Sequence, residues 1–142
     1  GPFTAPSLVE VHVELSPAFH DLDPMGIVWH GHYFKYFEIA RCALLQRLDY
    51  DFEQMRDSGF AWPVVDLRTK YIRPLKYGQR LRIEARLSEW ENRMRIDYVI
   101  RDADTGHVHT KAHTLQVAVE IASGELWLVT PAVFRERIGA PT

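Results

Sequence analysis

Apolar and polar residues alternate along residues 9–15, the period expected of a strand with one buried face. Pro, Gly and Asp then become frequent between Ser16 and Gly26, which predicts a loop. From about Trp29 to Leu48 the apolar residues recur at three- and four-residue spacing and form a single stripe, so this stretch is predicted to be a helix. The chain therefore opens with a strand, a long loop and a long helix.

The rest of the chain alternates in the manner of strands joined mainly by hairpins, after one short helix that Asp51 is placed to cap and Gly59 to end. Turns rich in breaker residues, such as Asp102 to Gly106, separate the alternating stretches. Pro131 is placed to open a short terminal helix. The predicted strands cover residues 62–72, 80–88, 94–100, 115–121 and 126–129.

One long apolar helix beside a largely antiparallel sheet is best buried against one face of that sheet. We therefore predict a single α+β domain over residues 4–142, with the antiparallel sheet wrapped around one long central helix. The other face of the sheet also needs a cover, and a partner subunit is the simplest one. The first three residues, Gly1-Pro2-Phe3, have the character of a remnant left by cleavage of an expression tag and are set aside.

Composition narrows the class of protein. The 142 residues carry 17 Lys and Arg against 19 Asp and Glu, a formal net charge of −2, which argues against non-specific nucleic-acid binding. No apolar run reaches the roughly 18 residues of a membrane span, and no signal peptide is recognisable. The single cysteine, Cys42, excludes an internal disulfide and a Cys-rich zinc site. We expect a cytoplasmic protein with no membrane span and no nucleic-acid partner.

The densest cluster of unusual residues lies in the loop before the long helix, where the chain reads Asp-x-Asp-Pro-x-Gly-Ile-Val-x-His from Asp21 to His30. An aromatic-rich Tyr-Phe-x-x-Phe-Glu-x-Ala-Arg segment follows from Tyr33 to Arg41. Together these motifs resemble the 4-hydroxybenzoyl-CoA thioesterase group of hotdog-fold acyl-CoA thioesterases, including its YbgC-like branch. The segment Val65 to Leu81, with its Tyr-Ile-Arg-Pro turn, also fits, so the resemblance covers nearly the whole chain.

The resemblance implies a hotdog fold and hydrolysis of an acyl-CoA or acyl-carrier-protein thioester to a free carboxylic acid and a thiol. It implies a catalytic carboxylate at Asp23 and a backbone N–H donor at His30. It implies no cofactor, because coenzyme A is part of the substrate, and no metal. Sites of this family lie between subunits, so the resemblance implies at least a homodimer, with a homotetramer of two dimers as the alternative.

The residues themselves are compatible with that chemistry. A carboxylate held just before a helix by Pro24 and a flexible Gly26 can face a ligand at the helix N-terminus, where free N–H groups can hold a developing oxyanion. Asp23 would then act either as the nucleophile or as the general base on water. The same pattern is also ordinary turn and capping chemistry, and Asp21 is better suited to hydrogen bonding within the loop than to catalysis.

Further residues are expected to bind the substrate. Tyr33, one turn into the helix, is placed to line an acyl pocket, and Arg73 and Arg93 lie at turns where they can meet phosphates. The turn after Trp90 holds a single basic residue where some relatives have several, which keeps a carrier-protein thioester open as the alternative to CoA. The predicted substrate-binding set is Gly26, Val28, Tyr33, Arg73 and Arg93.

Other candidate groups have simpler interpretations. Cys42 lies inside the helix without a histidine partner in the pattern, so we expect a small core residue and not a nucleophile. Glu38 and Arg41, three residues apart, are expected to form an ion pair. His107, His109 and His113 are predicted to share one strand face but fall short of a metal site.

Two rival functions remain open. A hotdog hydratase or dehydratase acting on 3-hydroxyacyl thioesters would need His30 and Glu38 to converge, and it leaves Asp23 unexplained. A non-catalytic acyl-thioester-binding subunit would need the pocket but not the carboxylate.

Overall fold

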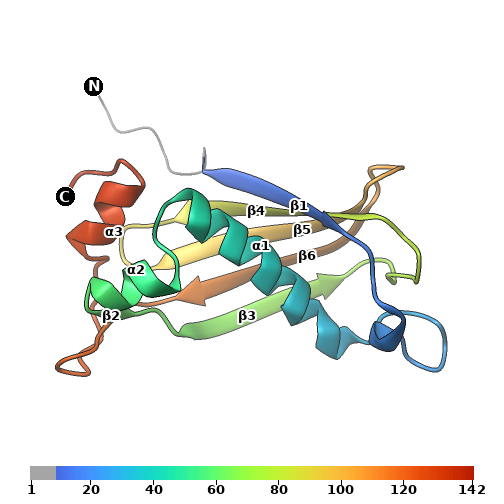
Figure 1. Cartoon of the computed structure of the whole chain (residues 1–142), viewed down its shortest axis with the longest axis horizontal. Helices are drawn as coiled ribbons and strands as arrows, with labels where there is room; N and C mark the ends of the chain where they lie inside the picture. Colours follow the sequence, from blue (N-terminus) through green and yellow to red (C-terminus); the bar gives the residue numbers. More distant parts are fainter. Residues whose placement is uncertain (1–8) are drawn as a thin grey trace.

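The structure, a computed structural model, describes residues 9–142. Five strands form one antiparallel sheet in the order β1-β4-β5-β6-β3, and the long helix α1 lies across one face of it (Figure 1). A second, two-stranded sheet joins β2 to β7. The elements are β1 (Glu10–Leu15), the 3-10 turns η2 (Phe19–Asp21) and η3 (His30–His32), α1 (Tyr33–Arg47), α2 (Phe52–Asp57), β2 (Phe60–Ala61), β3 (Val64–Tyr71), β4 (Leu81–Glu89), β5 (Met94–Asp102), β6 (Val108–Gln116), β7 (Val119–Glu120) and α3 (Ala132–Arg137).

The core lies between α1 and the sheet. Strands β4 and β5 alternate strictly and bury every second side chain against the helix. Phe37, Ala40 and Leu44 of the helix pack against them, and each is at most 1% exposed. The rings of Phe37 and Tyr98 lie 5.0 Å apart across this interface. Full burial of each such apolar side chain contributes about 1.5–3 kcal/mol, so this layer holds the helix on the sheet. The predicted hotdog architecture, an α+β domain with its sheet around one central helix, is confirmed.

The sequence prediction for the later strands was partly wrong. The strand expected to begin at residue 115 instead begins at Val108 and ends at Gln116. Its helix-facing side carries the buried hydroxyls of Thr110 and Thr114, so the stretch lacks the apolar alternation by which a strand is recognised. After Gln116 the chain leaves the large sheet, and residues 126–129 form no strand but a single bridge from Leu126 to Val119.

The helix predictions agree with the structure. Asp51 caps α2, with its Oδ1 accepting from the Phe52 N–H at 2.8 Å, and Pro131 is the N-cap of α3. Glu38 and Arg41 form the expected ion pair on α1. The helix itself starts at Tyr33, because η3 takes up the preceding three residues. The three residues set aside at the chain start lie outside the described residues.

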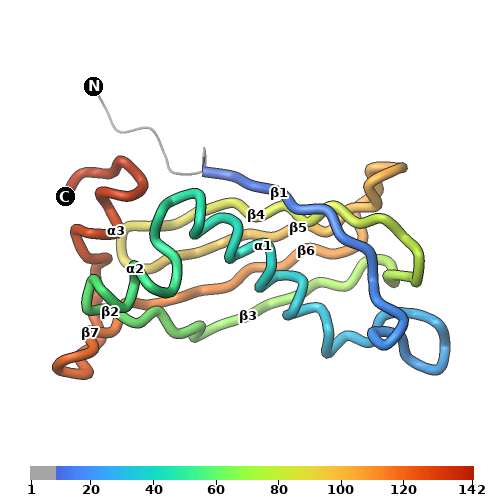
Figure 2. Tube along the Cα trace, viewed as in Figure 1, coloured from blue at the N-terminus to red at the C-terminus, as the bar shows by residue number. Residues whose placement is uncertain are grey.

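Strand β3 forms one edge of the large sheet, and the trace in Figure 2 shows it running free of any neighbour on its outer side. Strand β3 exposes the apolar side chains of Val65, Leu67 and Tyr71, by 56%, 41% and 53%. An edge strand with exposed apolar side chains is a template for pairing with another chain. Within residues 9–142, no helix is long and apolar enough to cross a membrane.

Candidate active site

Asp21 ties the loop before the helix to α1. Its carboxylate is 1% exposed and accepts from Lys35 Nζ at 2.6 Å, from the Tyr36 hydroxyl at 2.6 Å and from the Ala18 N–H at 3.2 Å. Burial alone raises the pKa of Asp21, but these hydrogen bonds and the charge of Lys35 outweigh it and lower the pKa to about 2. Asp21 is therefore the loop-anchoring residue that its position predicted.

Asp23 lies in a tight turn that fixes one of its two carboxylate oxygens. Its Oδ1 accepts from the N–H groups of Met25 at 2.8 Å and Ile27 at 3.3 Å. Gly26 closes the turn with a φ of +81°, a left-handed conformation that favours glycine, and donates its N–H to the Asp23 carbonyl at 3.0 Å. The Oδ2 oxygen makes no hydrogen bond within the described part of the chain, so it is available to a ligand or a water.

Two backbone hydrogen bonds fix the segment that leads from this turn into the helical region. The Val28 N–H donates to the Leu75 carbonyl at 2.8 Å, and the Trp29 N–H donates to the Asp21 carbonyl at 3.1 Å. The N–H groups of His30 and Gly31, which follow directly, have no acceptor among residues 9–142. They open the continuous helical segment η3–α1, where unpaired donors and the helix dipole favour negative charge.

These two features line one cavity of about 360 Å³. Its walls combine aliphatic and aromatic side chains: the rings of Tyr33 and Tyr71 lie 4.9 Å apart, and the centres of the His30 and Tyr71 rings lie 6.5 Å apart. The Trp29 ring covers Gly31 so closely that a Cβ there would lie 2.1 Å from it. The lining residues are Asp23, Ile27, Val28, Trp29, His30, Tyr33, Tyr71, Ile72, Arg73 and Pro74.

Three of the predicted substrate-binding residues, Val28, Tyr33 and Arg73, line this cavity beside Asp23 and His30. Two do not. Gly26 shapes the Asp23 turn without lining the cavity, and Arg93 lies in the β4–β5 turn at the far end of the protomer, paired with Glu89 at 2.9 Å (Figure 1).

Sequence reasoning missed Tyr71 and Ile72 as wall residues. Both belong to the Tyr-Ile-Arg-Pro segment, of which only the arginine stood out as a binding residue. Their signal is their position, since Tyr71 ends the edge strand β3 and Ile72 follows it just before a turn.

The histidines of the last hairpin do not form a metal site. His109 bonds through Nδ1 to the Pro74 carbonyl at 3.1 Å, and His107 bonds through Nδ1 to Arg73 at 3.1 Å. His113 instead lies near Arg95 on the outer face of the sheet. Among residues 9–142, no three His, Cys, Asp or Glu side chains gather as metal ligands.

Cys42 differs from its expected place in the core. It is exposed in the protomer, because it lies on the side of α1 that faces a second, larger cavity of about 690 Å³. Partial burial and the nearby charges of Asp51 and Glu38 raise the pKa of its thiol, which disfavours the reactive thiolate. We therefore still expect that Cys42 does not act as a nucleophile, although it lies outside the core.

The second cavity is lined chiefly by apolar side chains of α1, α2 and β2, among them Leu45, Met55 and Phe60. Four charged side chains also line it, Glu38, Arg41, Asp51 and Arg56, as does the amide of Gln116. Its Nε2 donates to the Trp62 carbonyl at 2.8 Å, whereas its buried Oε1 has no partner among the described residues. The cavity is thus an apolar space beside the start of β3.

Comparison with known proteins places the chain in a family. The model of the Thioesterase-like superfamily matches residues 17–138. The chain is 30% identical over 130 residues to the Synechocystis sp. protein named "Putative esterase sll0410", covering 91% of this chain and 77% of that one. A stretch of 66 residues is 36% identical to "Putative acyl-CoA thioesterase YneP" of Bacillus subtilis, covering 46% and 48% of the two chains.

Solved structures support the same fold. The crystal structure of Slr0204, a 1,4-dihydroxy-2-naphthoyl-CoA thioesterase from Synechocystis, superposes with a TM-score of 0.81 at 20% identity, over 92% of this chain and 96% of that one. The chain therefore belongs to the Thioesterase-like superfamily and is, as expected, a hotdog-fold thioester hydrolase.

Proposed function

We propose that this protein hydrolyses an acyl thioester with Asp23 as the catalytic carboxylate and the backbone N–H of His30 as the oxyanion donor. One observation carries the proposal: a carboxylate with a free oxygen and a helix start with unpaired N–H groups line the same cavity. Those are the two groups that thioester hydrolysis requires, one to attack or activate water and one to stabilise the charge that develops on the carbonyl oxygen.

The reaction consumes one water and releases one acid and one thiol. As a base, Asp23 takes a proton from the water that attacks the carbonyl carbon, the carbon–sulfur bond breaks when the intermediate collapses to acid and thiolate, and the proton on Asp23 passes to the thiolate to give the thiol. As a nucleophile, Asp23 attacks the carbonyl carbon itself, expels the thiolate and forms a mixed anhydride that water then opens. In either route the oxyanion faces the N–H of His30, which needs no rearrangement to receive it.

The substrate is proposed to be an acyl-CoA or an acyl-carrier-protein thioester. Two of the proteins compared above are named for acyl-CoA or aryl-CoA thioesters, which supports the CoA form. Arg73 lines the mouth of the Asp23 cavity and is a candidate contact for the phosphates. No separate cofactor enters the proposed reaction, because coenzyme A is carried in as part of the substrate.

We further propose a homodimer formed through the β3 edge, with a tetramer of two such dimers as the larger alternative. Antiparallel pairing of β3 with its copy about a two-fold axis sets the start of one strand, at Val64, beside the end of the other, at Tyr71. The apolar cavity beside the start of β3 then adjoins the Asp23 cavity of the second copy. In this proposed dimer we expect the acyl group to occupy the apolar cavity and the thioester carbonyl to lie at Asp23.

The dehydratase alternative receives less support from the geometry. Glu38 is held in an ion pair with Arg41, and the dehydratase reaction gives no role to the free oxygen of Asp23. A non-catalytic binder would not require the free oxygen of Asp23 to face the cavity. Hydrolysis uses the free oxygen of Asp23, the unpaired N–H groups at the helix start and the cavity that both of them line.

One panel of assays tests the proposal. The protein is incubated with short-chain, long-chain and aromatic acyl-CoAs and with the matching acyl-carrier-protein thioesters, and release of free thiol is followed. We expect thiol release with at least one substrate. Loss of water from a 3-hydroxyacyl-CoA without thiol release would establish the dehydratase, and binding without any turnover would establish the non-catalytic subunit.

A further inference from the structure

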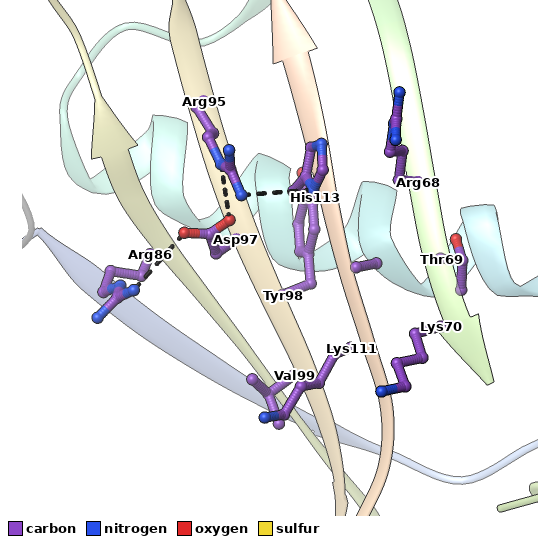
Figure 3. A pocket seen from close by; sticks show the side chains of 11 residues that line it. Arg68, Thr69, Lys70, Arg86, Arg95, Asp97, Tyr98, Val99, Lys111 and His113 are labelled. Carbon is purple, nitrogen blue, oxygen red and sulfur yellow. Dashed lines mark hydrogen bonds and ion pairs between the residues drawn. The ribbon is translucent and has the colours of Figure 1, made fainter. Parts of the chain in front are cut away.

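The face of the sheet away from α1 carries a shallow groove of about 500 Å³ that is rich in cations (Figure 3). Five Lys and Arg side chains line it together with one carboxylate, Asp97, on a chain whose net charge is −2. We call this the cationic groove. Its charged side chains are Arg68 and Lys70 on β3, Arg86 on β4, Arg95 and Asp97 on β5, and Lys111 and His113 on β6.

The charges at one end of the groove are not compensated. Lys70 and Lys111 are direct cross-strand partners in the β3–β6 register, and neither ammonium group makes an ion pair or hydrogen bond within residues 9–142. At the other end Arg95 and Arg86 both reach Asp97, at 3.0 and 3.5 Å. The two lysines therefore stand opposite each other with no acid between them, an arrangement that costs stability.

The same face shows how a like-charge pair is normally balanced. Arg82 and Arg101 are also direct cross-strand partners, on β4 and β5, but both bond to Glu84 at 3.1 Å. The Lys70–Lys111 pair is the cross-strand cation pair of this groove that lacks such an acid. An anionic ligand from outside the chain would supply the missing charge.

We propose that the cationic groove docks an acidic acyl carrier protein that presents the thioester. This inference rests on the proposed hydrolase function and selects the carrier-protein form of its substrate. Opposite charge on the two partners raises the rate of encounter and sets the orientation of docking. The groove extends over four strands, β3 to β6, an extent that fits contact with a protein surface (Figure 3).

Two other occupants fit the groove less well. A nucleotide such as that of CoA prefers a broad aromatic wall for its base, but the Tyr98 ring is 1% exposed and points into the core. The other uncharged walls include the aliphatic side chains of Val99 and Ala112 and the imidazole of His113. A second copy packed face to face about a two-fold axis would set the cationic groove against itself, and like charges would repel. An acidic protein meets neither obstacle.

The groove lies next to the proposed catalytic cavity. Lys70 and Tyr71 are neighbours on β3, and strand alternation sends Lys70 to the groove while Tyr71 lines the Asp23 cavity. The uncompensated lysines are thus at the end of the groove nearest the site. A docked carrier would extend its flexible prosthetic arm around the end of β3, past Arg73, to reach Asp23.

Charge reversal at single positions tests the docking. Lys70→Glu and Lys111→Glu are compared with Arg82→Glu, which inverts one charge on the same face outside the groove. Each variant is assayed with one acyl group, the best of the CoA panel, on CoA and on the carrier protein. We expect both groove variants to raise KM for the carrier-protein thioester at least about tenfold at low salt, with kcat unchanged and KM for CoA within about twofold.

A stability measurement supplies a second readout. Because Lys70→Glu replaces a like-charge pair by an ion pair, its melting temperature should rise by about 1–3 °C while its use of carrier protein falls. Equal KM values in all variants, an equal rise in KM for CoA, or turnover of CoA but not of carrier thioesters would each overturn the docking. The last result would leave the hydrolase intact, whereas failure of both substrate forms in the wild-type protein would refute the proposed function itself.

Discussion

Two aspartates, two residues apart, have opposite environments in this protein. Asp21 is buried and fully engaged by Lys35 and Tyr36, whereas Asp23 keeps one oxygen free at a cavity. A carboxylate that is already saturated with donors supports structure, and one with a free oxygen can meet a substrate. The sequence motif located both residues, and the structure shows what separates their environments.

The buried aspartate makes stability depend on pH. Because the pKa of Asp21 is about 2 in the folded chain, below its ordinary value, the unfolded chain binds more protons between about pH 4 and pH 2. Its contribution of about 2 kcal/mol is therefore present above pH 4 and is lost as the pH falls toward 2. Urea unfolding of wild type and Asp21→Asn should show this: the variant is less stable at pH 7, and the gap closes toward pH 2. A gap that stays constant with pH would contradict the assignment.

At the level of elements, the prediction succeeded where one face of an element is apolar. Helix α1 and strands β4 and β5 follow their periods closely, so their hydrophobic stripes predicted them. Strand β6 was placed too late because its buried face carries Thr110 and Thr114, the latter bonded to the Tyr98 hydroxyl at 3.0 Å. Buried hydroxyls remove the apolar alternation by which a strand is recognised in a single sequence.

The contribution of the Asp51 cap of α2 to stability, which the sequence predicts, can be measured directly. Asp51→Ala removes the acceptor for the Phe52 N–H and should lower the free energy of unfolding by about 1 kcal/mol, or about 3 °C in melting temperature. Glu53→Ala, in the exposed first turn of the same helix, is the control and should change stability much less. Equal losses in the two variants would show that general helix propensity matters here and the cap does not.

The wall of the apolar cavity offers a test of where the acyl group lies. Cys42→Phe adds a ring to a side chain that lines this cavity and is exposed in the protomer, so the core is not disturbed. We expect kcat/KM for long acyl chains to fall at least about tenfold while the shortest acyl substrates are little affected. Thiol-release kinetics over a chain-length series measure this. An equal loss for all chain lengths would place the acyl group elsewhere.

At the scale of the whole molecule, a single protomer leaves apolar surface uncovered. The β3 edge exposes apolar side chains, and the apolar cavity opens beside the start of the same strand. The sequence led us to expect a partner subunit over the other face of the sheet, whereas the exposed apolar side chains lie on the β3 edge, because exposure follows from the tertiary arrangement. The resemblance to a family and the element order carried the fold prediction further than periodicity alone.

Dimer formation through β3 can be tested by placing a charge on the edge. Leu67→Lys puts a cation at the centre of the proposed strand pairing and should yield a monomer in light scattering, with thiol-release activity lost alongside the dimer. Leu128→Lys, at a position 79% exposed and away from β3, is the control and should remain dimeric and active. A dimeric Leu67→Lys protein would exclude this edge as the interface.

The central claim is that Asp23 performs the chemistry, and Asp23→Asn tests it most directly. The amide keeps the shape and the acceptor oxygen for the Met25 and Ile27 N–H groups but removes the base and nucleophile. We predict that kcat for thiol release falls by at least about a hundredfold, with the melting temperature and oligomeric state of the wild type. Turnover within about twofold of wild type in a correctly folded Asp23→Asn protein would contradict the account.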